Sequence, residues 1–119
     1  MKTTSLIVLS FLISFTAFAQ NKNAKLTLKV DGVCGMCKHR IENAAIKTKG
    51  VKSAVWSLET KECAIIFDER KTDIPTISQR IANVGHDTEI VKATDQAYNS
   101  VDACCLYRDE EVIKAHQKN

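Results

Sequence analysis

The chain has 119 residues, of which 45% are hydrophobic and 6% aromatic, and its formal net charge is +3 at pH 7. This length suits one domain with a modest core. The nearly balanced charge and the scarcity of aromatic side chains exclude a basic stripe or a base-stacking surface, so we expect no nucleic-acid partner. Five cysteines in so short a chain point to sulfur chemistry instead.

The first 19 residues predict a cleavable export signal. Lys2 precedes an apolar run over 6–18 that only Ser and Thr interrupt, and the segment ends in Ala17-Phe18-Ala19. A positive start, a short hydrophobic segment and an A-x-A site form a secretory signal, whereas a membrane anchor needs about 20 apolar residues. We therefore expect cleavage after Ala19, a periplasmic protein and no membrane association of the mature form.

The mature chain is predicted to open with a strand, a cysteine loop and a helix. The strand covers 25–30, where apolar residues alternate with polar ones. Asp31-Gly32 ends this strand, and helix spacing then runs from about 37 to 49, until Gly50. The expected buried positions are Leu26, Leu28 and Val30 on the strand and Ile41, Ala44, Ala45 and Thr48 on the helix.

A hairpin, a second helix and a last strand are predicted next. Strands over 51–58 and 63–69 flank a turn at 59–62, and a helix capped by Thr72-Asp73 carries Pro75 in its first turn and stops at Gly85. A short strand covers 87–91. The inward positions are expected to be Ala54, Trp56, Leu58, Cys63, Ile65 and Phe67 on the hairpin, and Ile74, Ile77, Ile81 and Val84 on the helix.

This order predicts an α+β fold, a ferredoxin-like βαββαβ plait whose two helices pack on one face of a four-stranded antiparallel sheet. Residues 20–93 would form the domain. Residues 94–119 would form a short C-terminal extension, with a helix near 96–101, a loop or strand at 104–107 and a polar tail from Glu110.

Cys34 and Cys37 are the leading metal-ligand candidates. They lie where a strand turns into a helix, and the free N–H groups and the dipole of that helix start favour thiolates. Two thiolates form a soft site that favours Cu(I) and also suits Zn(II), although structural zinc normally takes four ligands. A surface disulfide is the alternative in an oxidising compartment.

The adjacent Cys104 and Cys105 are predicted to fold back and add one or two thiolates, which would give a three- or four-sulfur site. Neighbouring side chains diverge in a strand or a helix, so both cysteines could face the first pair only through a turn. A second site, an intermolecular bond and a disulfide are the alternatives.

Two further residues are candidates for tuning the site. His86 follows Gly85 in a loop expected beside the cysteine loop, where it could donate to a thiolate or ligate, or remain a plain surface histidine. Met36 lies between Cys34 and Cys37, so its thioether could assist a soft metal or simply pack.

Between Lys25 and Lys92 the chain resembles the heavy-metal-associated domain family, which includes copper chaperones, modules of copper-pumping ATPases and a periplasmic mercury-binding protein. In this resemblance Cys34 and Cys37 match the metal-binding cysteines. Val33 stands where the family places a buried Met, His86 stands where many members carry Tyr or Phe, and the Cys104-Cys105 tail lies outside the pattern. Further matches are Ile41-Glu42, Gly50-Val51, Phe67-Asp68 and Gly85.

The resemblance implies a metal carrier and not an enzyme. Its cargo would be Cu(I), with Zn(II), Hg(II) or Cd(II) as alternatives, and its task trafficking, sequestration or resistance. A metal-exporting ATPase or another carrier would be its partner, and two copies could share one ion as a metal-bridged dimer. The rival hypothesis is a thiol–disulfide oxidoreductase using the same C-x-x-C, but the helical spacing that follows Pro75 does not favour it.

Overall fold

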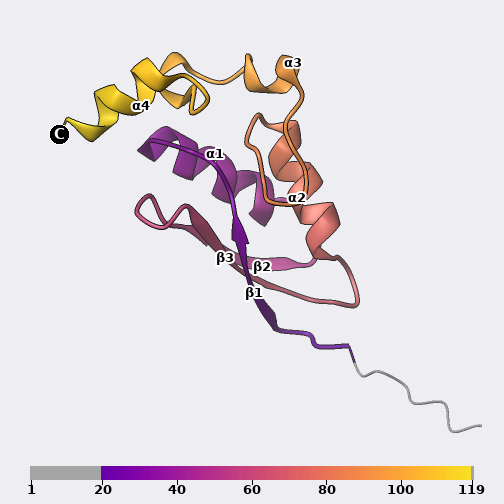
Figure 1. Ribbon diagram of the computed structural model, residues 1–119. Helices are drawn as coiled ribbons and strands as arrows, with labels where there is room; N and C mark the ends of the chain where they lie inside the picture. The colour runs from indigo at the N-terminus through magenta and orange to yellow at the C-terminus, as the bar shows by residue number, and fades with distance from the viewer. Residues whose placement is uncertain (1–19, 119) are drawn as a thin grey trace, which may run out of the picture.

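The computed structural model describes residues 20–118, so the predicted export signal at 1–19 lies outside the described residues. Three strands, β1 (Ala24–Lys29), β2 (Val51–Trp56) and β3 (Glu62–Phe67), form an antiparallel sheet in the order β1-β3-β2. Helices α1 (Gly35–Ile46) and α2 (Ile74–Asn83) lie on one face of this sheet (Figure 1). The predicted α+β arrangement is therefore present, with three strands.

The fourth strand predicted at 87–91 is replaced by a tight turn. The N–H of Thr88 donates to the carbonyl of Val91 at 2.8 Å, and its hydroxyl accepts from the N–H of Val91 at 2.9 Å. Within the described chain, a single bridge between Val30 and Thr88 is what remains of the predicted pairing. Leu26, predicted to be buried, is 47% exposed because β1 stays at the edge of the sheet.

The core between sheet and helices follows the predicted pattern closely. Ile41 and Ala45 of α1 and Ile77 and Ile81 of α2 are fully buried, as the periodicity indicated. At the start of α2, the Asp73 carboxylate accepts from the N–H of Thr76 at 2.8 Å, which confirms the predicted cap.

Two hairpin positions show where the predicted pattern holds and where it fails. Cys63 is a core residue as predicted, and burial raises the pKa of its thiol to about 12. Leu58 is 41% exposed, because β2 ends at Trp56 and the following residues already belong to the turn.

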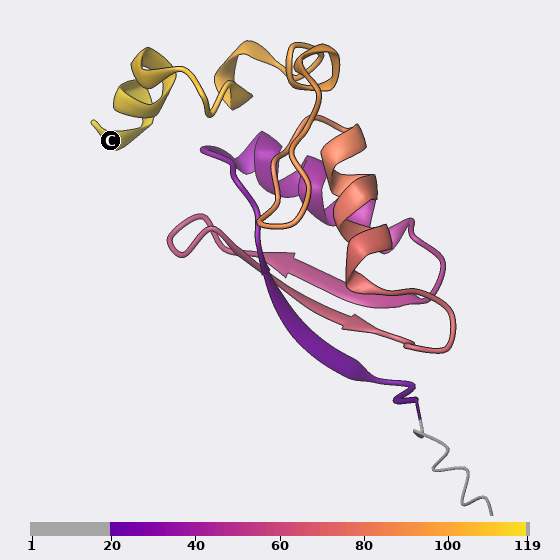
Figure 2. The ribbon, with the colours of Figure 1, turned by 45° about the vertical axis from the view of Figure 1, so that its right-hand side comes forward.

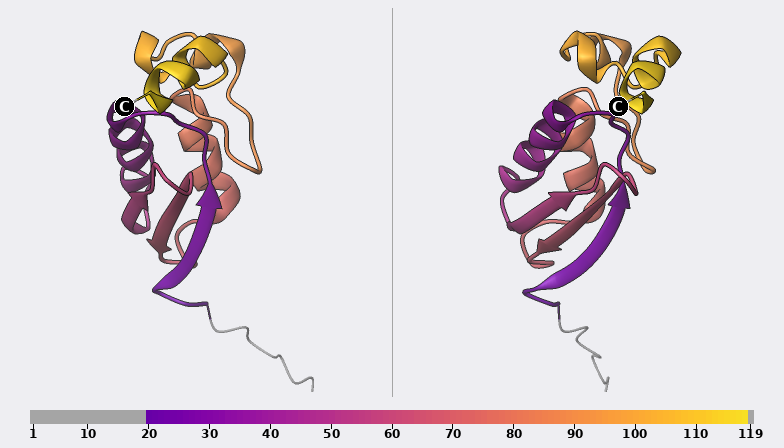
Figure 3. Two further views of the ribbon diagram at one scale, coloured as in Figure 1. Left: turned by 60° about the vertical axis from the view of Figure 1, so that its left-hand side comes forward. Right: turned by 90° about the vertical axis from the view of Figure 1, so that its left-hand side faces the viewer.

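Residues 94–118, the tail, cross the end of the domain where α1 begins and α2 ends, as all the views show (Figures 1, 2 and 3). The tail contains α3 (Asp95–Tyr98), the 3₁₀ turn η1 (Ala103–Cys105) and α4 (Glu110–Gln117). Thus the predicted short helix is present, whereas 104–107 begins as a 3₁₀ turn and the supposed polar tail contains a helix. Within 20–118 no helix has both the length and the apolar character needed to span a bilayer.

Gly85→Ala is expected to lower the free energy of unfolding by about 1–3 kcal/mol. Gly85 has φ +105°, and an added Cβ would lie 2.5 Å from Cγ1 of Val101 and 2.7 Å from the carbonyl oxygen of Ala97, both in the tail. Urea denaturation measures the loss. Gly35→Ala is the control, since a Cβ there meets nothing within 4 Å; equal stability of the two variants would contradict the prediction.

Candidate metal centre

The loop between β1 and α1 presents Cys34 and Cys37 at the start of the helix. Cys34 is the N-cap, with extended backbone angles, and its carbonyl accepts the first helical hydrogen bond from the N–H of Lys38 at 3.1 Å. The helix therefore begins at Gly35, two residues earlier than predicted. Cys37 lies in its first turn and is fully buried.

A tryptophan supports this loop from within the core. Trp56 donates from its indole N–H to the carbonyl of Val30 at 2.9 Å. A Cβ at Gly32 would lie 3.0 Å from the Trp56 ring and 3.0 Å from Cβ of Cys37, so glycine allows the ring to pack tightly against the cysteine loop. Trp56 is thus a packing residue that supports the backbone of the loop leading to Cys34.

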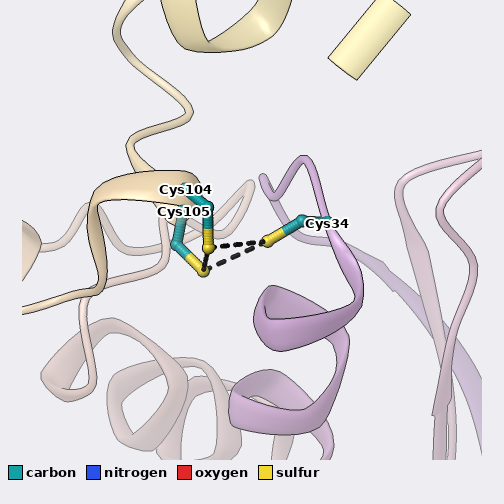
Figure 4. A group of neighbouring side chains, drawn as sticks. All are labelled: Cys34, Cys104 and Cys105. Carbon is teal, nitrogen blue, oxygen red and sulfur yellow. Dashed lines mark hydrogen bonds between the residues drawn. The ribbon is translucent and has the colours of Figure 1, made fainter. Parts of the chain in front are cut away.

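The four predicted thiols lie together. The Sγ atom of Cys34 lies 3.2 Å from that of Cys37. It also lies 3.2 Å from that of Cys105 and 3.9 Å from that of Cys104 (Figure 4). The last two sulfurs are 3.9 Å apart. Both can face Cys34 because η1 is a turn, which is the geometry that the adjacency of the two cysteines required. All five cysteines are free thiols in this structure.

The spacing of three of these sulfurs suits a single ion. The Sγ atoms of Cys34, Cys104 and Cys105 all lie within 4.8 Å of one another. Two sulfurs that bind a tetrahedral ion at about 2.3 Å are about 3.8 Å apart. The 3.9 Å separations already match this value, and the 3.2 Å separations need to open only slightly.

The four thiols differ in how easily they ionise. Burial would raise the pKa of Cys34, but hydrogen bonds from the Cys37 thiol and N–H and from the tail thiols hold it below the usual value. Burial is the main cause that raises the pKa of Cys37 and of Cys105. Cys34 is therefore the sulfur that most readily becomes a thiolate, the form that binds metals.

Three residues, which we call the tail clasp, hold the tail against the domain: Asp87, Tyr107 and Arg108. The Tyr107 hydroxyl donates to the carbonyl of Gly85 at 2.7 Å and accepts from the N–H of Asp87 at 2.9 Å. Arg108 donates from Nη2 to Oδ1 of Asp87 at 2.7 Å and from Nε to Oδ2 at 3.3 Å. A second link joins Arg40 of α1 to Asp102, 3.2 Å apart, just before η1.

The ionisation of Asp87 reflects this clasp. Burial alone would raise the pKa of Asp87, but hydrogen bonds from Arg108 and from the N–H of Ala93 hold it below its usual value. Tyr107 is buried, and its pKa is raised mainly by that burial. A charged carboxylate and a neutral hydroxyl thus form the attachment at neutral pH.

His86 and Met36 occupy different positions relative to the sulfurs. His86 is fully buried, which lowers its pKa; Nδ1 lies 2.8 Å from the carbonyl oxygen of Asp31, and the ring stacks on Tyr107 at 5.4 Å. Its hydrogen bond thus goes to the loop backbone, and the expectation of a plain surface histidine is wrong. Met36 is 51% exposed, and the Cys104 thiol donates to its Sδ at 3.4 Å.

Neither the tail clasp nor α4 was predicted from the sequence. The helix had a detectable signal: Asp109 precedes two glutamates, its carboxylate accepts from the N–H of Glu111 at 3.0 Å, and Lys114 and His116 lie in the last turn. Tyr107 and Arg108 carried no comparable pattern, because their partners are about twenty positions earlier in the chain.

Comparison with known proteins identifies the fold and the loop. The sequence profile of the heavy-metal-associated domain matches residues 27–87, a range that contains both Cys34 and Cys37. The chain belongs to the heavy-metal-associated domain family. The tail and its two cysteines lie outside the matched range.

Curated relatives include copper and mercury proteins. The chain is 34% identical over 64 residues to the copper chaperone CopZ of Staphylococcus saprophyticus, covering 53% of this chain and 94% of the chaperone. It is 32% identical over 87 residues to the periplasmic component of a mercuric transport protein from Shewanella putrefaciens, covering 72% and 93%. A copper-exporting P-type ATPase of Staphylococcus haemolyticus is 35% identical over 66 residues, which are 55% of this chain but only 8% of the ATPase.

Solved structures agree with this assignment. A CopZ metallochaperone matches with a TM-score of 0.53 and 30% identity, over 55% of this chain and 98% of the other. Oxidised MerP from Ralstonia metallidurans CH34 matches with a TM-score of 0.54 and 26% identity, over 56% and 94%. Both comparisons support the ferredoxin-like arrangement of the heavy-metal-associated domain.

Tyr107→Phe is expected to loosen the tail. It removes the hydroxyl that pairs with the carbonyl of Gly85 and the N–H of Asp87, and so leaves these buried backbone groups without a partner. The expected loss of stability of the attached tail is about 1–3 kcal/mol. Amide hydrogen exchange over 94–118 should then become faster, while exchange in α1 and the sheet stays slow. Tyr98→Phe is the matched control, since the Tyr98 hydroxyl accepts one exposed bond from the N–H of Arg108. Equal exchange in the two variants would show that the clasp does not hold the tail.

Proposed function

We propose that this protein binds a thiophilic metal ion, with Cu(I) as its principal cargo, through Cys34, Cys37, Cys104 and Cys105. The observation that carries the proposal is the group of three sulfurs within 4.8 Å, with a fourth sulfur 3.2 Å from Cys34, in a member of a metal-binding family. Thiolates bind soft ions preferentially, and Zn(II), Hg(II) and Cd(II) are therefore the competing cargoes.

The tail makes this site more enclosed than a two-cysteine loop alone. Cys37 and Cys105 are fully buried, and Cys34 is nearly so. Binding replaces the thiol protons with the ion, so protons leave to water as the metal enters. An enclosed set of three or four thiolates suits sequestration, or transfer that keeps the ion away from water and stray ligands.

We further propose that the protein works outside the cytoplasm as a carrier and not as a catalyst. The sequence of residues 1–19 and the periplasmic mercury relatives support export. The match to part of a copper-exporting ATPase supports such a pump, or another carrier, as the exchange partner. Because the chain's own tail places two thiols against Cys34, we expect one ion per monomer instead of a metal-bridged dimer.

The oxidoreductase alternative gains no support. Pro75 lies in the first turn of α2, as the helical spacing after it indicated, and not in front of a strand beside the cysteines.

Residues 20–119, reduced and free of oxygen, are expected to bind one Cu(I) per chain, and Cys105→Ser should weaken binding by roughly 10–100-fold because it removes a buried ligand. Titration against a chromophoric Cu(I) chelator measures both values. Cys63→Ala is the control, since Cys63 lies in the core outside the sulfur group. Equal binding by the double variant Cys34→Ser/Cys37→Ser would end the proposal, and equal binding by Cys104→Ser/Cys105→Ser would restrict the site to the loop.

Expression of the full chain in a Gram-negative host should give a periplasmic protein whose mass corresponds to a start at Gln20, because the A-x-A site ends at Ala19. Cell fractionation followed by intact-mass spectrometry checks this. Ala19→Arg, which places a large charged residue at the cleavage point, should leave the precursor uncut. An unprocessed wild-type chain in the cytoplasm would contradict the proposed localisation.

A further inference from the structure

Met36 and Cys104 form a sulfur pair at the surface of the metal centre, which we call the outer pair. Their sulfur atoms lie 3.4 Å apart. Met36 is 51% exposed and Cys104 is half-buried, whereas Cys34, Cys37 and Cys105, the inner thiols, are all buried. The sulfurs thus change from exposed to buried across one connected group.

The outer pair connects directly to the inner thiols. From Cys104 the next sulfur is 3.9 Å away at Cys34 and also 3.9 Å away at Cys105. An ion held by Cys104 is therefore within reach of an inner thiol without any movement of the backbone. The sulfur of Met36 extends this path by one step toward solvent.

The thioether of Met36 is open to solvent. Met36 is 51% exposed and lines an open groove of about 560 Å³ beside α1, together with His39, Arg40 and Asp102. The groove gives a small metal complex access to the thioether.

We propose that the outer pair takes up the incoming ion and passes it to the inner thiols; this inference rests on the proposed function. A neutral thioether is a soft ligand that suits Cu(I) and holds it less firmly than a thiolate, so it favours capture followed by release. The outer pair would also serve release, because the ligand of a receiving molecule could bind the ion there at the protein surface.

The transfer is a ligand exchange without change of oxidation state. The ion first leaves the ligands of its incoming complex and binds Sδ of Met36 and Sγ of Cys104, and the Cys104 thiol loses its proton to water. A bond to Sγ of Cys34 then forms while the bond to Met36 breaks, and the Cys34 proton leaves likewise. Bonds to Sγ of Cys105 and Cys37 then complete the inner site, and each of these two thiols also releases its proton to water.

Met36→Leu tests this role, because leucine keeps the apolar volume and lacks the sulfur. Stopped-flow transfer of Cu(I) from its bicinchoninate complex to residues 20–119 should slow by about tenfold, while the equilibrium affinity changes by less than about twofold. Asn43→Gln, in the same groove and with neither a sulfur nor an imidazole ligand, is the control and should not slow transfer. Zn(II) uptake should be unchanged in Met36→Leu, since zinc takes thiolate, imidazole and carboxylate ligands.

A second measurement observes Met36 itself. Met1 and Met36 are the two methionines of the sequence, so a ¹³C-methyl label reports on Met36 alone in a chain that starts at Gln20. Substoichiometric Ag(I), a redox-stable stand-in for Cu(I), should broaden or shift this signal, and a full equivalent should return it close to the metal-free position.

The outcomes separate this inference from the proposed function. If wild-type protein binds neither Cu(I) nor Ag(I), both fail. If it binds tightly but Met36→Leu takes up Cu(I) at the wild-type rate, only the uptake role is overturned. A fall in affinity as large as the fall in rate, or a methyl signal that stays shifted at one equivalent, would make Met36 a permanent ligand and also overturn the transient role.

Discussion

The grouping of the four thiols depends chiefly on one attachment, the contact of the buried Tyr107 and the Arg108 guanidinium with the loop that follows α2. Without it, the position of Cys104 and Cys105 would rest mainly on the Arg40–Asp102 pair, since η1 is too short to be stable by itself. With it, the Tyr107 hydroxyl satisfies two backbone groups, and the paired Asp87 carboxylate is held in its charged form. A charged hydrogen-bonded pair of this kind contributes more than a neutral hydrogen bond.

The same contacts explain why the sheet has three strands. Asp87 accepts from Arg108 and from the N–H of Ala93, and Thr88 closes a turn onto Val91, so the backbone that would have paired along β1 turns toward the tail. The pairing that remains is the bridge from Val30 to Thr88, next to the cysteine loop. Residues 87–91 therefore do not pair with β1 as a strand, and Asp87 instead binds Arg108 of the tail.

The features that could be predicted well from the sequence are those that depend on residues close together in the chain. The cap at Asp73, the proline that follows it and the spacing of Ile77 and Ile81 identify α2 with little ambiguity, because each signal acts within a few residues. The position of Cys34 and Cys37 at a helix start follows from the same kind of pattern. In contrast, Leu26 fits its alternating pattern yet is exposed, because burial there depends on a fourth strand that does not form.

The parts that could not be predicted depend on side chains that meet across a long separation in sequence. No periodicity links Asp87 to Arg108, and nothing near Tyr107 indicates that its hydroxyl reaches Gly85. The adjacency of Cys104 and Cys105 did restrict the geometry, since both could face one loop only from a turn, but no local pattern showed that a turn forms at 103–105. His86 illustrates the same limit, because its burial follows from stacking on Tyr107 of the tail.

An enclosed sulfur site raises the question of how a cargo ion leaves it. The inner thiols are inaccessible to a large partner, and opening the whole tail would require breaking the Asp87–Arg108 pair together with the buried contacts of Cys105 and Tyr107. A path through the outer pair avoids this cost, because Cys104 is half-buried and Met36 faces the groove. In the proposed function the clasp and the outer pair would be complementary: the clasp would keep the ion enclosed, and the outer pair would allow exchange while the enclosure stays intact.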